Sequence, residues 1–346
     1  MLNKKNAIYI ISSILLCLII IASIQWGAVN ITNKQMVEAV QHFFQGKTPS
    51  SIYEGVFLQI RLPRVILCMF SGAILAVSGV FMQGLFRNPL VEPGIIGTSA
   101  GAAFGASIVF VLAAYIPIEW KSLIGPLLVP LFAFTGALVA TYIVYAISKS
   151  QQKTNVLSIL LVGLAINSMG LSGMGFMTYI ARDPQARSIN FWNLGTFSGA
   201  NWQQVLIVFS LLIIVILSIF KFIKPLNALL LGEDEALYLG INIKKFRRKI
   251  LLINTLMVAI VTSFVGVIGF VGLIVPHIVR QFVGSDHKKL LPASMIIGAS
   301  VLLMADLVAR LLLAPSEIPI GIITSLVGAP IFILLLKKNL FLKADA

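Results

Sequence analysis

Three arginines stand out because the chain around them carries little other charge. Arg61 and Arg64 come directly before an uncharged run over 65–86, and Arg310 follows Asp306 by four residues in LLMADLVAR. A guanidinium group presents a planar fork of N–H donors that suits a carboxylate. These arginines are therefore candidates for binding an acidic partner. The alternative is that they snorkel to lipid headgroups, and the spacing of Asp306 and Arg310 predicts an ion pair on a helix surface.

A second group of charges lies in the segment 231–242, LGEDEALYLGIN. Glu233 begins a run of three acids, which favour the positive end of a helix dipole, and Gly240 stands where a helix would end. The pattern predicts a short amphipathic helix between two membrane spans. Such a helix is either ordinary loop structure or a knob for a soluble partner.

Small, amide and methionine side chains inside two apolar runs are candidates for lining a substrate pathway, because they suit a wide and adaptable path. In 62–86 and 155–181 they are Ser78, Met82, Gln83, Asn167, Met174 and Met177. The alternative is ordinary packing of small residues between helices.

Several kinds of chemistry are not supported. The chain has no phosphate-binding loop of the form G-x4-G-K-[ST], no histidine, cysteine and carboxylate set with metal-ligand spacing, and no pair of catalytic acids. His277 is read as a polar residue near a helix end. The apolar runs also lack the buried acids of an ion-coupled secondary transporter, which is the competing class of function. We therefore expect neither an enzyme nor a cofactor bound by this chain.

Composition sets the fold class. The 346 residues are 58% hydrophobic, with a mean hydropathy of +0.99, which predicts an all-α polytopic membrane protein in one domain over 1–346. The net charge of +14 does not indicate nucleic-acid binding, because the charges lie in short loops beside apolar runs. Ten spans are predicted: 6–28, 62–86, 94–114, 122–148, 155–181, 201–222, 248–267, 270–284, 291–314 and 318–336.

Two breaks within apolar sequence need special backbone. Pro89 and Pro93 end the span over 62–86, and Gly97, Gly101 and Gly105 follow at a spacing that predicts one close-packing helix face. The uncharged stretch 250–279 is either one long helix or two short ones separated at the glycines of 266–272.

Charge bias favours two elements there. That choice places 18 of the 26 basic residues on one side, which marks the cytoplasm and puts both termini there. The opposite side then holds 29–61, with a short surface helix near 37–44, about 115–121, the interfacial segment 182–200, the 266–272 turn and 315–317.

Five segments together resemble the permeases of ABC importers for ferric siderophores, haem and cobalamin: 61–64, 71–102, 231–242, 266–280 and 305–336. The resemblance covers nearly the whole chain. It implies a type II importer permease of the bacterial inner membrane and a homodimer with its pathway at the two-fold axis. It also implies two cytoplasmic ATPase subunits, which use ATP and Mg²⁺, and a periplasmic binding protein.

By the same resemblance, Arg61, Arg64 and Arg310 contact acids of the binding protein. The residues of the coupling segment that seat in the ATPase are Gly232, Glu233, Ala236, Leu239 and Gly240. The segment 177–202 is most similar to haem permeases, so Arg182 or Arg187 is expected to meet propionates and Met174 or Met177 an apolar macrocycle. A ferric siderophore is the close alternative cargo, and cobalamin the third.

Overall fold

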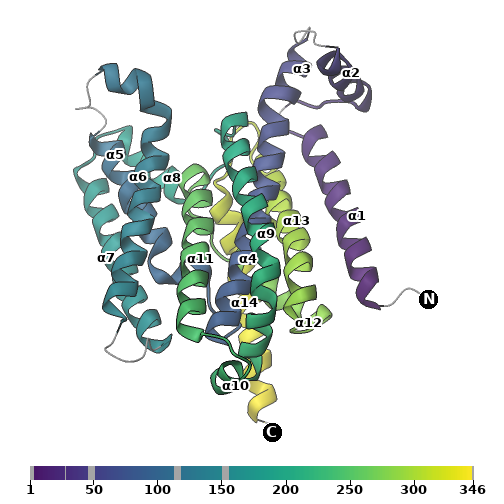
Figure 1. Ribbon diagram of the computed structural model, residues 1–346. Coiled ribbons are helices and arrows are strands. Elements are labelled where there is room, and N and C mark those ends of the chain that lie inside the picture. Colours follow the sequence, from purple (N-terminus) through teal and green to yellow (C-terminus); the bar gives the residue numbers. More distant parts are fainter. Residues whose placement is uncertain (1–3, 28, 46–50, 113–117, 150–155, 345–346) are drawn as a thin grey trace.

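The computed structural model describes residues 4–27, 29–45, 51–112, 118–149 and 156–344, which form a bundle of helices (Figure 1). The helices are α1 (Lys4–Gln25), α2 (Asn33–Phe44), α3 (Ile52–Gly55), the π-helix η1 (Val56–Arg61), α4 (Leu62–Phe86), the 3₁₀-helix η2 (Pro93–Ile96), α5 (Thr98–Leu112), α6 (Ile118–Ile147), α7 (Val156–Ile180), α8 (Gln185–Asn193), α9 (Trp202–Leu231), α10 (Glu233–Tyr238), α11 (Ile243–Val265), α12 (Val271–Val283), α13 (His287–Leu311) and α14 (Ile320–Ala344).

Each of the ten predicted spans overlaps one of the longer helices, so the all-α membrane fold is confirmed. Within the described residues, eight helices are long and apolar enough to cross a membrane, and α5 and α12 are shorter. With 15 and 13 residues, these two measure about 22 and 20 Å, less than a bilayer core of about 30 Å. The predicted spans 94–114 and 270–284 are therefore present as apolar helices that are shorter than the other eight, and the predicted count of ten spans is approximate.

Irregular segments precede both short helices and meet inside the bundle. The carboxylate of Glu92 accepts a hydrogen bond from the Phe270 backbone N–H at 3.2 Å, and the Asn254 amide donates to the Pro93 carbonyl at 3.2 Å. Backbone without helical hydrogen bonds is tolerated at membrane depth only where protein surrounds it. The stretch 250–279 is thus two elements, as the charge bias predicted.

The predicted glycine face is correct in two of its three positions. Gly101 and Gly105 lie in α5 against the α6 backbone at Gly136 and Phe132, where any side chain would clash. Gly97 is not on that helix face, because it ends η2 in the left-handed conformation, with φ of 87°. The prolines of the hinge delay the start of α5 past this position.

Helix α4 forms the centre of the bundle and is buried along almost its full length. Gly72 lies against Gly298 of α13, and Gly79 against Gly272 of α12. These contacts bring helix backbones close together, so α4 is tightly enclosed by its neighbours.

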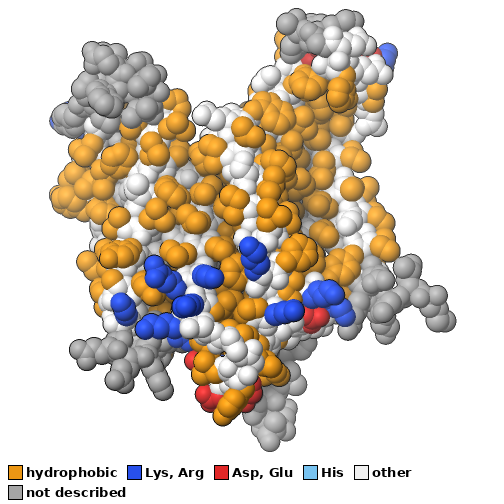
Figure 2. Space-filling view, in the orientation of Figure 1, with side chains coloured by type: hydrophobic (Ala, Val, Ile, Leu, Met, Phe, Trp, Pro, Cys, Tyr) orange, Lys and Arg blue, Asp and Glu red, His pale blue; other side chains and the backbone are white. Residues whose placement is uncertain are grey.

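The two ends of the bundle differ in character (Figures 1 and 2). Helices α2 and α3 lie at one end, called the α2 end. Helix α10 lies at the other end, called the α10 end. The first residues of α1 and the last residues of α14 lie on this side as well. Lys and Arg side chains gather in a band just above α10. The short helices expected near 37–44 and within 182–200 are present as α2 and α8.

Two long helices depart from their predicted bounds. The helical path into α4 begins at Ile52, ten residues earlier than expected, because the π-helix η1 joins the end of α3 to the start of α4 without a break. Helix α9 continues to Leu231, past Lys221, Lys224 and Pro225, where a charged helix end was expected. The predicted outer loop at about 115–121 is shorter than expected, because α6 already begins at Ile118, while 115–117 lie outside the described residues.

Candidate functional site

The three predicted docking arginines come together at the α2 end, with two acids the sequence did not connect to them as a group. This arginine cluster consists of Arg61 from η1, Arg64 from α4, Asp306 and Arg310 from α13, and Glu317 from the segment before α14. Arg64 donates to Asp306 at 2.8 Å and to Glu317 at 2.7 Å. Arg310 donates to the other oxygen of Asp306 at 3.1 Å.

The cluster also holds the last turn of α1. Arg310 donates to the Ser23 hydroxyl at 2.6 Å and to its carbonyl at 3.0 Å, and Arg61 donates to the carbonyls of Ile24, Gln25 and Val29. The last carbonyls of a helix lack internal partners, and a nearby cation also suits the negative end of the helix dipole. The cluster therefore joins α1, α4 and α13.

The three arginines of the cluster are buried, which contradicts a position at the lipid headgroups. Arg61, Arg64 and Arg310 are 5%, 7% and 8% exposed, and Asp306 is 1% exposed. They do not snorkel to headgroups, and the predicted surface ion pair of Asp306 and Arg310 is a buried one. A buried charge is tolerated when it is paired and hydrogen-bonded. Arg64 and Arg310 are paired with Asp306, whereas Arg61 is hydrogen-bonded to backbone carbonyls. Docking through these arginines remains a prediction.

The segment 231–242 forms the expected short helix, α10, at the opposite end. The Ile241 N–H donates to the Ala236 carbonyl at 3.0 Å and the Gly240 N–H to that of Leu237 at 2.9 Å, with Gly240 at φ of 78°. This pair of bonds is a Schellman motif, which closes the helix firmly.

The geometry of α10 leaves an apolar tip free. Ala236 is fully buried, whereas Leu237, Tyr238 and Leu239 are 55%, 91% and 64% exposed. At the base, Gly232 has φ of 147°, and Glu233 accepts a hydrogen bond from Arg247 of α11 at 2.8 Å. The sequence pattern does not single out Arg247, because this residue lies within a run of basic residues, KKFRRK.

The three pathway candidates from α4 are enclosed. Ser78, Met82 and Gln83 are fully buried. The Ser78 hydroxyl donates to Asn254 of α11, and the Gln83 amide donates to the Leu273 carbonyl of α12 at 2.9 Å. Ser78 and Gln83 thus bond α4 to α11 and α12, which agrees with the alternative interpretation of these residues, and all three side chains are enclosed in the single chain.

The candidates on α7 have a different setting. Asn167 donates to the Ile95 carbonyl at 3.1 Å, and Met174 and Met177 are half-buried. Much of the remaining α7 surface is exposed and apolar, including Leu164 and Phe176. The structure therefore divides the predicted pathway residues into an enclosed set on α4 and an accessible set on α7.

Beyond α7, Arg182 and Arg187 are exposed, and Arg187 lies 3.6 Å from Asp183. Arg187 also lines an open cavity of about 490 Å³ between α8 and helices α4, α5, α9 and α11. The lining includes five aromatic side chains, namely Phe110, Phe191, Trp192, Phe197 and Phe264. An arginine beside aromatic rings suits a flat, apolar molecule that carries an acid.

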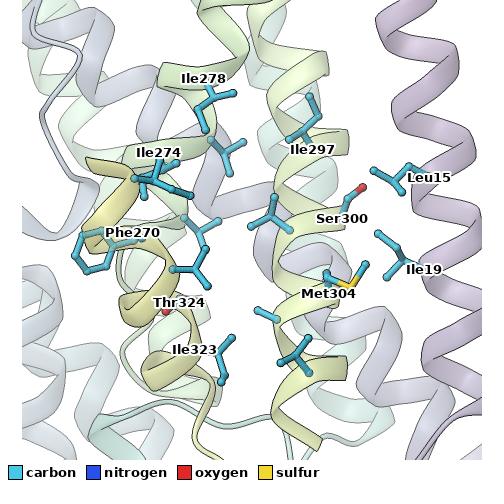
Figure 3. A pocket seen from close by; sticks show the side chains of 18 of the residues that line it. Leu15, Ile19, Phe270, Ile274, Ile278, Ile297, Ser300, Met304, Ile323 and Thr324 are labelled. Atoms are coloured by element: carbon cyan, nitrogen blue, oxygen red, sulfur yellow. The ribbon is translucent and has the colours of Figure 1, made fainter. Parts of the chain in front are cut away.

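A second hollow, of about 420 Å³, lies between α1, α12, α13 and α14 (Figure 3). Its walls are apolar apart from Ser12, Ser300 and Thr324. Leu15 and Ile19 of α1 face Ser300 and Met304 of α13 across it. With no charged side chain in its lining, this groove cannot orient an ionic cargo.

Comparison with known proteins adds independent findings. The sequence profile described as the FecCD transport family matches residues 15–338. The hemin transport system permease HmuU of Yersinia pestis is 39% identical over 287 residues, covering 82% of this chain and 84% of that protein. The cobalamin import system permease BtuC of Halobacterium salinarum is 39% identical over 280 residues, covering 81% and 73%.

Solved structures agree in fold. A chain described as the inward-facing conformation of a metal-chelate type ABC transporter superposes with a TM-score of 0.80 at 30% identity, covering 94% of this chain and 97% of that one. PsaBC from Streptococcus pneumoniae superposes with a TM-score of 0.54 at 16% identity, which concerns the fold alone.

Proposed function

Because the chain belongs to the FecCD transport family and is the permease of an ABC importer, we propose that it moves haem from a periplasmic binding protein into the cytoplasm. In this proposal two copies of the chain form a homodimer, and two ATP-binding subunits drive alternating access from the cytoplasmic side. The chain itself carries out no catalysis.

The observation that carries the coupling part is the exposed tip of α10. An apolar tip on a rigidly closed helix, beside a band of basic side chains, is suited to seat in a groove of a soluble subunit. The same basic band supports a cytoplasmic location for this end. The ATPase subunits would then contact α10, and the binding protein would contact the α2 end.

The homodimer is supported by α7. Its apolar side chains, among them Leu164, Met169 and Phe176, are exposed in the single chain, while polar Asn167 and Ser168 accompany them. A mixed surface of this kind suits a helix that contacts a second copy along part of its length and lines a path along the rest. Met174 and Met177 lie on this helix and are our candidates for contact with the cargo.

Haem is favoured over the other cargoes by the region around α8. Arg182 and Arg187 are exposed, and aromatic side chains line the cavity beside Arg187. Haem combines an apolar ring with two carboxylates, which matches this chemistry. Overall identity does not rank the cargoes, since the hemin and cobalamin permeases are equally similar to the chain. A ferric siderophore is the second candidate, favoured by the metal-chelate transporter of similar fold.

An ion-coupled secondary transporter is the competing class. Such a protein needs an acid that can bind and release an ion within the membrane. Asp306 is buried inside α13, but both its oxygens are engaged by Arg64 and Arg310. This pairing leaves Asp306 poorly suited to carry protons, and the match to the FecCD transport family favours an importer driven by ATP.

Uptake into proteoliposomes containing the permease and its ATPase subunits tests the proposal directly. Haem, a ferric siderophore and cobalamin are each presented on a binding protein, with ATP inside the vesicles. We expect ATP-dependent accumulation of haem, and faster ATP hydrolysis with the haem-loaded binding protein alone. Stimulation by cobalamin or siderophore instead would reject haem, and uptake driven by an ion gradient without ATPase subunits would reject the importer.

A further inference from the structure

We propose that Glu317 is paired with Arg64 while the permease is free, and that a carboxylate of the binding protein takes the place of Glu317 on docking. The loss of this pair would release the segment that leads into α14. This inference rests on the proposed function only in naming the binding protein as the partner. The exchange itself is argued from the arginine cluster.

The two acids that pair with Arg64 differ in access to solvent. The Asp306 side chain is 1% exposed and is shared between Arg64 and Arg310, whereas the Glu317 side chain is 33% exposed. An incoming acid can therefore reach the position of Glu317 but not that of Asp306. Because Arg64 keeps Asp306 throughout, the exchange never leaves a buried guanidinium without an acid.

The charge of the cluster also favours an added acid. Three arginines face two carboxylates, Asp306 and Glu317, so the formal charge is +1. Arg61 is bonded only to backbone carbonyls in the contacts described, and it lies in the same cluster as Arg310. This excess positive charge attracts an approaching carboxylate, and Arg64 already binds one carboxylate, that of Glu317, in the geometry that the incoming acid would adopt.

Release of Glu317 would act on the start of α14. The next residue, Ile318, donates its N–H to the Ala309 carbonyl at 3.1 Å. Ile320 and Gly321 donate to the carbonyls of Gly195 and Leu194, at 3.0 and 2.8 Å, in the connection that follows α8. Glu317 thus precedes by one residue the hydrogen bond from Ile318 to α13. It precedes by three residues the first of the two hydrogen bonds to the segment after α8. The cluster is linked by this short stretch to the region that we propose contacts the cargo.

The test compares docking affinities of the permease–ATPase complex in nanodiscs for the binding protein that stimulates its ATPase. We expect Glu317→Gln to tighten docking about two- to fivefold, the range for losing competition from a partly exposed ion pair. Arg64→Gln should weaken docking and reduce its salt dependence. Glu38→Gln removes an exposed acid from α2 at the same end and is the matched control for net charge.

A second measurement needs no binding protein. In a complex whose Cys17 and Cys68 are replaced by alanine, Ile318→Cys reports the exposure of the segment through its rate of labelling by a water-soluble maleimide. We expect the added Glu317→Gln change to raise this rate, and the added Glu38→Gln change to leave it unaltered.

The outcomes separate this inference from the proposed function. If Glu317→Gln weakens docking, or leaves both docking and labelling unchanged, Glu317 is a structural partner and the exchange is rejected, even though transport continues. Equal tightening by Glu38→Gln rejects it as well, since the effect would then be general electrostatics. Loss of ATP-driven uptake in the unaltered complex would instead reject the proposed function.

Discussion

The arginine cluster and α10 are both predicted to contact other proteins, yet they differ in how much of the predicted contact surface is exposed in the free chain. The cluster buries its three arginines and bonds them to groups of the same chain, while α10 buries Ala236 at its base and exposes an apolar tip. A site for a partner can thus be either open in advance or already occupied by residues of the chain itself.

The physical reason is the free energy that each kind of side chain costs when it has no partner. A leucine exposed to water on a short helix costs little and gains when a partner covers it. An arginine at the edge of a membrane bundle must keep its hydrogen bonds, so the chain supplies carboxylates and carbonyls. The comparison predicts that the cluster contributes to stability and α10 to assembly, and the following variants test that division.

The largest effect is expected for Asp306→Asn. It leaves Arg64 and Arg310 buried with one carboxylate, Glu317, and breaking a buried ion pair in this way costs about 3–5 kcal/mol. Thermal unfolding of the detergent-solubilised complex measures the loss. Glu317→Gln is the matched control, and its partly exposed pair should cost no more than about 1 kcal/mol. Equal losses for the two variants would contradict the ranking by burial.

Leu239→Arg should abolish assembly without affecting the fold. Placing a charge at the centre of an apolar contact costs at least about 2 kcal/mol of binding free energy. Co-purification of the ATPase subunits checks the first part, and an unchanged unfolding temperature of the isolated permease checks the second. Leu239→Met, which preserves volume and apolar character, should retain the ATPase subunits. A destabilised permease would show that this leucine belongs to the fold.

Gly240→Ala should weaken the closure of α10. The φ of 78° is strained for any residue with a Cβ, at a cost of about 1–2 kcal/mol. We expect faster hydrogen exchange over 236–241 and reduced coupling between ATP hydrolysis and uptake. Gly55→Ala is the control, because its Cβ would meet no atom and its backbone is helical, so it should be neutral or slightly stabilising.

The smallest effect is expected for Glu233→Gln. The carboxylate is 42% exposed, so losing its pair with Arg247 should cost no more than about 1 kcal/mol. Glu233→Lys should reduce ATPase-coupled uptake more, because it places like charges together at the base of α10. Uptake rates of the two variants, compared at low and high salt, measure the difference. A lysine variant as active as the glutamine variant would argue that this pair does not orient α10.

Several features could be predicted from the sequence because they depend on local pattern. Apolar runs identified ten of the helices, and the acids at 233–235 with Gly240 identified α10. The glycines of 266–272 indicated the break between α11 and α12. Helix bounds were less reliable where a proline lies inside a continuing helix, as Pro225 does in α9.

Other features depend on residues far apart in the chain. Arg64 and Asp306 are 242 positions apart, and Asn254 and Pro93 are 161 apart. Composition showed that Ser78 and Gln83 were unusual for an apolar helix, but only packing showed that they bond to α11 and α12. The same residue types would serve equally well in an open path.

The sequence by itself determined that this is a helical membrane protein, where its helices lie, and which segments are unusual enough to carry function. Hydrophobicity, proline, glycine and charge act over a few residues, so their effect can be read locally. Only the tertiary structure decided that α5 and α12 start within the bundle, that the three arginines predicted for docking are buried, and that Glu317 pairs with Arg64. Burial and ion pairing are properties of the whole packed bundle, because the solvent around each charge depends on every helix that surrounds it.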